Sequence, residues 1–182
     1  GEAARSRLVA ELQALLSATP YPMFEMDGEG RVLRSWLPNV RTTTVDTQRL
    51  IGHKVSVTLP AAAATAIMQG LDEAARHGRV QDVQFALPSP EGERWFAMSA
   101  GRIAGDDDPP RFAVQVRNIT AERQAERELR IAASVFTHAG EGVLISGPDS
   151  RILAVNQAFR TILGYTDDDP LIGTYTRDLR IV

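Results

Sequence analysis

The feature that most constrains this chain is a short sequence that occurs twice. Asp27–Leu33 is followed by Leu50–Gly52, and the similar Gly147–Leu153 is followed by Leu171–Gly173. From position 31 to position 151 is 120 residues, and from 50 to 171 is 121, so the two pairs keep register within one residue. Solenoid repeats have periods of about 20–50 residues, so this spacing predicts two copies of one domain. The second copy is shorter, and we expect the chain to be a piece of a longer protein.

Composition narrows the class of protein. The chain has 182 residues, 43% of them hydrophobic and 24% charged, which is typical of globular protein. Its net charge of −3 argues against a nucleic-acid-binding surface, and no apolar stretch approaches the roughly 18 residues that a membrane span needs. The absence of cysteine excludes disulfides, thiolate nucleophiles and cysteinyl-flavin chemistry. We expect a cytoplasmic location.

Hydrophobic periodicity predicts the elements. Alternating apolar residues indicate strands at 23–26, 31–36, 83–87, 93–103 and 111–117 of the first copy, and at 142–146 and 151–155 of the second. Helical spacing indicates helices at 5–17, 61–77, 120–136, 156–163 and 167–171. Gly78 is predicted to cap the helix before it, and the Thr120 hydroxyl is predicted to cap the helix that it begins. This order predicts an α+β fold, an antiparallel sheet with helices on one face.

These residues resemble the PAS domain family. The second copy carries Asn156-Gln157-Ala158-Phe159, then Gly164-Tyr165 and Leu171–Gly173, an arrangement similar to a common PAS pattern. The first copy departs from it at Trp36–Asn39, but its Asn118–Arg123 resembles the element that closes many PAS domains, with Asn118 where Asp is usual.

The resemblance implies a five-stranded antiparallel sheet of order 2-1-5-4-3 with helices over one face. It divides the chain into an N-terminal amphipathic helix (1–20), a first PAS domain (21–120), a linker helix (121–138) and the first part of a second PAS domain (139–182). Domains of this kind occur at the input end of histidine kinases, diguanylate cyclases and phosphodiesterases, that is, in two-component and cyclic-di-GMP signalling. They bind a small ligand, or they dimerise and relay strain along the flanking helices.

A ligand pocket is predicted between the sheet and the helices of the first domain. The residues expected to line it are Phe24, Met26, Trp36, Ile51, Phe85, Phe96, Met98 and Phe112. Trp36 could stack on a planar ring. The alternative is that these side chains fill the core and leave no space for a ligand.

A second predicted site is the relay and dimerisation surface, made of apolar helical stripes and the residues where the linker helix begins. Its members are Leu8, Leu12, Leu15, Asn118, Thr120, Ala125, Leu129, Ala132 and Phe136. The linker stripe indicates either a parallel coiled coil or docking on a neighbouring sheet, since fewer than three heptads are present. The N-terminal leucines pack either on the first domain's sheet or on a partner's helix.

Other motifs carry no predicted chemistry. His53 and His77 are expected at the surface, which disfavours haem, and His138 is expected to cap the end of the linker helix. We predict no metal site because Asp106–Asp108 and Asp167–Asp169 lack the pattern of a calcium loop. Gly28 and Gly30 fit a hairpin turn and not a nucleotide-binding loop. No catalytic constellation is visible, so we predict no enzyme activity within this segment.

The function that these observations favour is a sensory module that homodimerises and signals through helical linkers to an effector domain in the same polypeptide. A small ligand would bind in the first domain, with no cofactor expected. The alternative is a structural dimerisation module with a filled core. The incomplete second copy would expose apolar side chains, so we expect it to be covered by another chain, by the first domain or by further residues of its own polypeptide.

Overall fold

The computed structural model describes residues 1–36, 47–105 and 109–182. The chain forms two compact units, Gly1–Ala121 and Glu122–Val182. Trp36–Asn39, where the first copy departs from the PAS pattern, lies mostly outside the described residues, and the acidic run Asp106–Asp108 lies wholly outside them.

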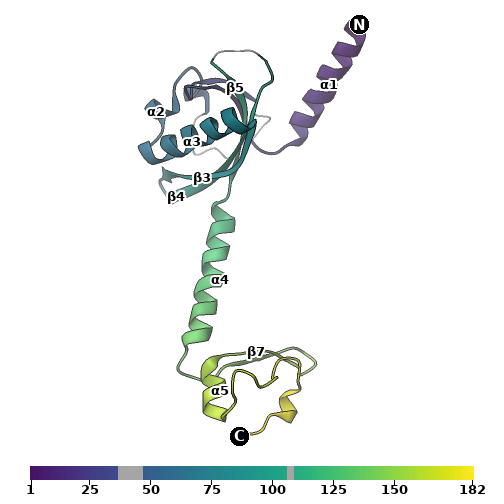
Figure 1. Ribbon diagram of the computed structural model, residues 1–182, viewed down its shortest axis with the longest axis vertical. Helices are drawn as coiled ribbons and strands as arrows, with labels where there is room; N and C mark the ends of the chain where they lie inside the picture. Colours follow the sequence, from purple (N-terminus) through teal and green to yellow (C-terminus); the bar gives the residue numbers. More distant parts are fainter. Residues whose placement is uncertain (37–46, 106–108) are drawn as a thin grey trace. The chain divides into compact units, whose positions relative to one another are not determined.

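A five-stranded antiparallel sheet forms the body of the first unit (Figure 1). The hydrogen-bonded order is β2-β1-β5-β4-β3, as predicted. Its strands are β1 (Met23–Asp27), β2 (Val32–Trp36), β3 (Arg79–Ser89), β4 (Gly92–Arg102) and β5 (Arg111–Asn118). Alternation directs every second side chain to one face, so the apolar residues of these strands form one continuous layer.

Three helical segments of the first unit cover that apolar face, and α2 and α3 lie on the same side of the sheet in Figure 1. They are a single 3₁₀ turn (Thr47–Arg49), α2 (Val55–Thr58) and α3 (Ala61–His77). The apolar stripe of α3 buries Ile67 and Leu71 against the sheet. Gly78 takes a left-handed conformation, with φ of 86°, and its N–H donates to Ala74, so the predicted cap is confirmed.

The helix α1 (Glu2–Ala18) precedes the sheet and has no buried residue. It ends where Thr19 becomes extended, because a residue before proline is disfavoured in the helical region.

The second unit holds most of α4 (Thr120–His138), followed by β6 (Leu144–Ser146), β7 (Ile152–Val155), α5 (Gln157–Leu163) and a 3₁₀ turn (Thr176–Asp178). The predicted helix at 167–171 is wrong. Asp169 instead accepts hydrogen bonds from the Thr166 N–H and hydroxyl at 2.6 and 3.1 Å, and this local closure, with Pro170 after it, forms a turn.

The two glycine-turn hairpins have the same topology, which confirms the internal repeat. In the first, the Gly52 N–H donates to the Val32 carbonyl at 2.7 Å, and in the second the Gly173 N–H donates to the Ile152 carbonyl at 2.8 Å. Gly52 and Gly173 both have positive φ, 82° and 85°. The repeated sequence therefore encodes the same backbone path twice.

The hairpins also share a bulge. Between Glu25 and Met26 on β1 the partner residue moves from Arg34 to Val32, so Leu33 is an extra residue on β2. The register shifts in the same way beside Ile145 in the second unit.

Candidate ligand cavity and helix junction

The first unit contains a cavity of about 280 Å³ between the apolar face of the sheet and the helices. It is lined by Pro20, Tyr21, Pro22, Phe24, Met26, Val32, Thr47, Leu50, Val55, Leu59, Ile67, Phe85, Leu87, Phe96, Met98, Val114, Val116 and Asn118. An engineered cavity of about 150 Å³ holds benzene, so this volume suits a molecule of roughly a dozen non-hydrogen atoms.

The walls of the cavity are chemically simple. Phe85 and Phe96 stack with ring centroids 5.7 Å apart, and aliphatic side chains form most of the remainder. Tyr21, Thr47 and Asn118 are the polar side chains among the described lining residues, and none of those residues is charged. A site with these walls favours an uncharged ligand, because a charge would lose its hydration without gaining a partner.

Five of the eight residues predicted for the pocket line this cavity: Phe24, Met26, Phe85, Phe96 and Met98. The other three lie elsewhere. Phe112 is fully buried in the core, Ile51 packs against that core, and Trp36 is about one-third exposed.

Trp36 is turned away by the bulge in β2. Strict alternation from the buried Val32 would place Trp36 on the same face, but the extra Leu33 reverses the pattern beyond it. The side chain of Arg34 lies over the Trp36 ring at 5.8 Å from its centroid and also pairs with Glu25, so all three share the opposite face.

Several lining residues were not predicted, and for most of them a signal was present. Val114 and Val116 alternate along β5, and Ile67 lies on the apolar stripe of α3. Tyr21 and Thr47 carry no such signal, because Tyr21 precedes β1 and Thr47 begins a single 3₁₀ turn.

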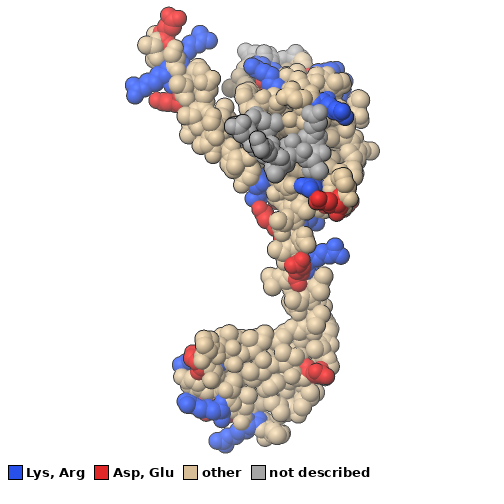
Figure 2. All heavy atoms as spheres, turned by 180° about the vertical axis from the view of Figure 1, so that it is seen from behind, with Lys and Arg blue, Asp and Glu red and all other residues tan. Residues whose placement is uncertain are grey.

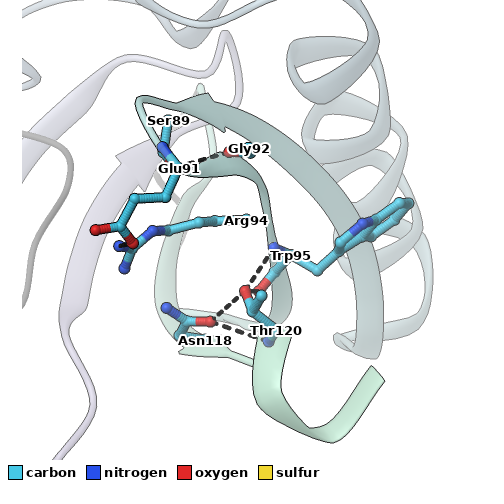
Figure 3. Close-up of polar contacts among 7 residues, drawn as sticks. All are labelled: Ser89, Glu91, Gly92, Arg94, Trp95, Asn118 and Thr120. Carbon is cyan, nitrogen blue, oxygen red and sulfur yellow. Dashed lines mark hydrogen bonds and ion pairs between the residues drawn. The ribbon is translucent and has the colours of Figure 1, made fainter. Parts of the chain in front are cut away.

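The relay residues Asn118 and Thr120 lie together where β5 ends and α4 begins (Figure 3). The Thr120 hydroxyl accepts from the Trp95 N–H at 2.9 Å and lies 2.7 Å from Asn118 Oδ1, to which it donates. The Ile119 N–H donates to the Trp95 carbonyl at 2.8 Å. These bonds fasten the first residue of α4 to β4 within the first unit.

The predicted capping role of Thr120 is wrong in its detail. Asn118 Oδ1 accepts from the Thr120 N–H at 3.0 Å, so the side chain that caps the start of α4 is Asn118. The Thr120 hydroxyl is directed to the neighbouring strand. In Figure 3 the Trp95 indole points away from both residues, and only its backbone takes part.

The apolar stripes predicted for dimerisation are exposed. Leu8, Leu12 and Leu15 of α1 are 56, 50 and 67% exposed, and Leu129 of α4 is 71% exposed. Ala125 and Ala132 are exposed and Phe136 is half-buried. In Figure 2 the visible face of the second unit is formed largely by uncharged residues.

A buried carboxylate was missed by the sequence reasoning. Glu25 is 2% exposed, although it belongs to the face of the sheet opposite the cavity. It accepts from Arg34 Nε at 2.7 Å and from an Arg111 terminal nitrogen at 2.9 Å, one arginine on each neighbouring strand. The sequence contained a signal for this pair. Glu25 stands among the apolar residues of β1, and the residue opposite it on β2 is Arg34.

Asn156 organises the second unit. Its Oδ1 accepts from the N–H groups of Val143 and Phe159 at 2.8 and 2.9 Å, and its Nδ2 donates to the carbonyls of Phe136 and Glu141 at 3.0 and 2.9 Å. All four hydrogen-bonding positions of the amide are used, and the residue is 2% exposed.

The three histidines lie outside the cavity wall. His53 and His77 are exposed in the first unit, and His138 Nδ1 lies 2.9 Å from the Ser134 carbonyl at the end of α4. No cluster of three or more metal-ligating side chains occurs within 1–36, 47–105 and 109–182. Over the same ranges, no helix is both long and apolar enough to cross a membrane.

Residues 130–181 match the family model described as PAS domain. Over this segment the second unit is similar to PAS domains, which agrees with the family predicted from the sequence. No curated protein matches the chain.

Among solved structures, the PAS domain of a protein from Colwellia psychrerythraea is 15% identical over 63% of this chain and 98% of its own, with a TM-score of 0.48. The PAS domain of an HTR-like protein from Haloarcula marismortui is 16% identical over 65% of this chain and 97% of its own, with a TM-score of 0.46. The PAS domain of the RpfR quorum-sensing receptor from Cronobacter turicensis, in complex with BDSF, is 18% identical over 56% and 96%, with a TM-score of 0.42.

Proposed function

We propose that this chain is a sensory PAS module whose first unit binds a small molecule in the 280 Å³ cavity and passes the bound state to α4. The observation that carries the proposal is that Asn118 contacts both the cavity and the start of α4. It lines the cavity, and its side chain caps the first residue of α4. A change at the cavity wall therefore reaches the linker helix through one residue.

Homodimerisation through α1 and α4 is the second part of the proposal. The exposed leucines of these helices are unfavourable in water, and a partner helix would bury them. The signal would pass through these helices to an effector such as a histidine kinase, a diguanylate cyclase or a phosphodiesterase in the same polypeptide.

The cavity can be tested by filling it. Val116 lines the cavity, whereas Val57 is 76% exposed on α2, so Val116→Phe and Val57→Phe add the same ring in two environments. Native mass spectrometry and absorbance of the purified chain, followed by binding of small neutral aromatics, should show that Val116→Phe abolishes binding and that Val57→Phe keeps it. Thermal melts of both variants establish that they are folded.

The alternative is a structural dimerisation module that takes no ligand. The exposed stripe of α4 favours it as strongly as it favours the sensor. Binding that is equal in the two valine variants, or absent from the unaltered chain, would support this alternative and refute the ligand function.

A further inference from the structure

Among the described residues that line the cavity, Asn118 carries the one side-chain amide, beside the hydroxyls of Tyr21 and Thr47. Asn118 follows Val114 and Val116 at steps of two along β5, and it pairs with the cavity-lining Phe96 across the sheet. Alternation therefore places its side chain on the cavity face, while its neighbour Arg117 belongs to the other face.

The orientation of the Asn118 amide is fixed by its partner. The Thr120 N–H can only donate, so the atom that it meets at 3.0 Å must be the oxygen of Asn118, not the nitrogen. Figure 3 shows the nitrogen on the side away from Thr120. In the part of the chain that the structure describes, this nitrogen makes no hydrogen bond.

Asn118 therefore has two separable functions. Its oxygen holds the start of α4, and its nitrogen offers a donor at the rim of the cavity, where Asn118 is exposed to solvent. An aspartate here would keep the first function and lose the second, because an ionised carboxylate accepts but does not donate. Within the described lining, none of the residues carries a charge with which an anion could pair.

We propose that the cavity selects an uncharged, mainly apolar ligand with one hydrogen-bond acceptor, such as a ketone, ester or lactone oxygen, and that this acceptor bonds to Asn118 Nδ2. The inference rests on the proposed ligand function of the cavity. A ligand that bonds to Nδ2 restrains the same side chain that caps α4. The ligand's acceptor therefore acts directly on the first turn of the helix.

The test compares three naphthalenes of nearly equal size in fluorescence titrations of the full chain. 2-Acetylnaphthalene carries the acceptor, 2-isopropylnaphthalene replaces it with a methyl group, and 2-naphthoate carries a charge. The measured quantity is the ratio of dissociation constants of the hydrocarbon and the ketone, which removes effects common to both.

The variants are Asn118→Asp and Gln115→Glu. Both convert an amide to a carboxylate on β5, but Gln115 pairs with Met23 and Ser99 on the face opposite the cavity and is not a lining residue. A net hydrogen bond contributes enough for a shift of about threefold to tenfold. We expect Asn118→Asp to weaken binding of the ketone relative to the hydrocarbon by that factor, and Gln115→Glu to leave the ratio unchanged. For the unaltered chain, 2-naphthoate should be the weakest of the three ligands.

Hydrogen exchange at the start of α4 supplies the second readout. Addition of 2-acetylnaphthalene should change exchange of the first-turn amides in the unaltered chain and not in Asn118→Asp, whose retained oxygen keeps the cap without ligand. If the naphthalenes bind but the ratio and the exchange are the same in both variants, the assignment of Asn118 is overturned and the ligand cavity stands. If none binds to the unaltered chain, the ligand function itself fails and this inference fails with it.

Discussion

Asn156 provides the sharpest test of how the second unit is held together, and the perturbation is Asn156→Asp. The substitution is nearly isosteric, and it keeps an oxygen for the N–H groups of Val143 and Phe159. It removes both donors, so the carbonyls of Phe136 and Glu141 lose their partners and face a negative charge.

The expected loss follows from those two bonds. A buried polar group left without its partner costs about 1–3 kcal/mol, and two such groups give a destabilisation of about 2–6 kcal/mol. Because Asn156 is 2% exposed, water cannot easily replace the lost donors. The matched control is Gln157→Glu, the same chemical change at the exposed first residue of α5, where a negative charge suits the helix dipole and stability should change by less than about 0.5 kcal/mol.

The assay is native-state hydrogen exchange on the full chain, which reports each unit separately. The amides of Val143 and Phe159 in the second unit should lose protection in Asn156→Asp, while amides of the five-stranded sheet keep theirs. Equal protection in Asn156→Asp and Gln157→Glu would refute the reasoning, because it would mean that the two donated hydrogen bonds contribute nothing.

Three further perturbations have defined outcomes. Thr120→Val leaves the Trp95 N–H without its acceptor and should destabilise the first unit by about 1–2 kcal/mol in denaturant titrations, whereas Thr120→Ser should stay close to the unaltered chain. Glu25→Gln weakens two charge-assisted bonds, including that to Arg34, and should lower stability by about 1–3 kcal/mol; an unchanged melting temperature would mean that water already replaces them. Leu129→Glu puts a charge in the exposed stripe of α4 and should shift sedimentation toward the monomer, and an unaltered sedimentation profile would remove α4 from the proposed dimer interface.

The regular part of the fold could be predicted because its signals are local. Alternation gave the five strands of the first unit, and Gly78 marked the end of α3. The strand order came from the family resemblance, since alternation alone does not say which strands pair.

The candidate site could be predicted only in part, for a physical reason. Residues inside unbroken alternation, such as Phe96 and Met98, were assigned to the correct face. Trp36 was not, because one inserted residue in β2 reverses the side on which a side chain lies, and a bulge leaves little trace in the sequence. The two contacts of Asn118 could not be predicted from the sequence either, because they depend on which atom of the amide faces the helix.

The turn of the repeated hairpin has a consequence for how the two copies can be packed. A Cβ at Gly30 would lie 2.5 Å from the Met68 sulfur of α3, so the methionine side chain would have to shift to admit any other residue there. The equivalent residue of the second copy is Ser150, which carries a side chain at a φ of 60°. A helix that packed on that second hairpin as α3 packs on the first would therefore need a different side-chain arrangement at the turn.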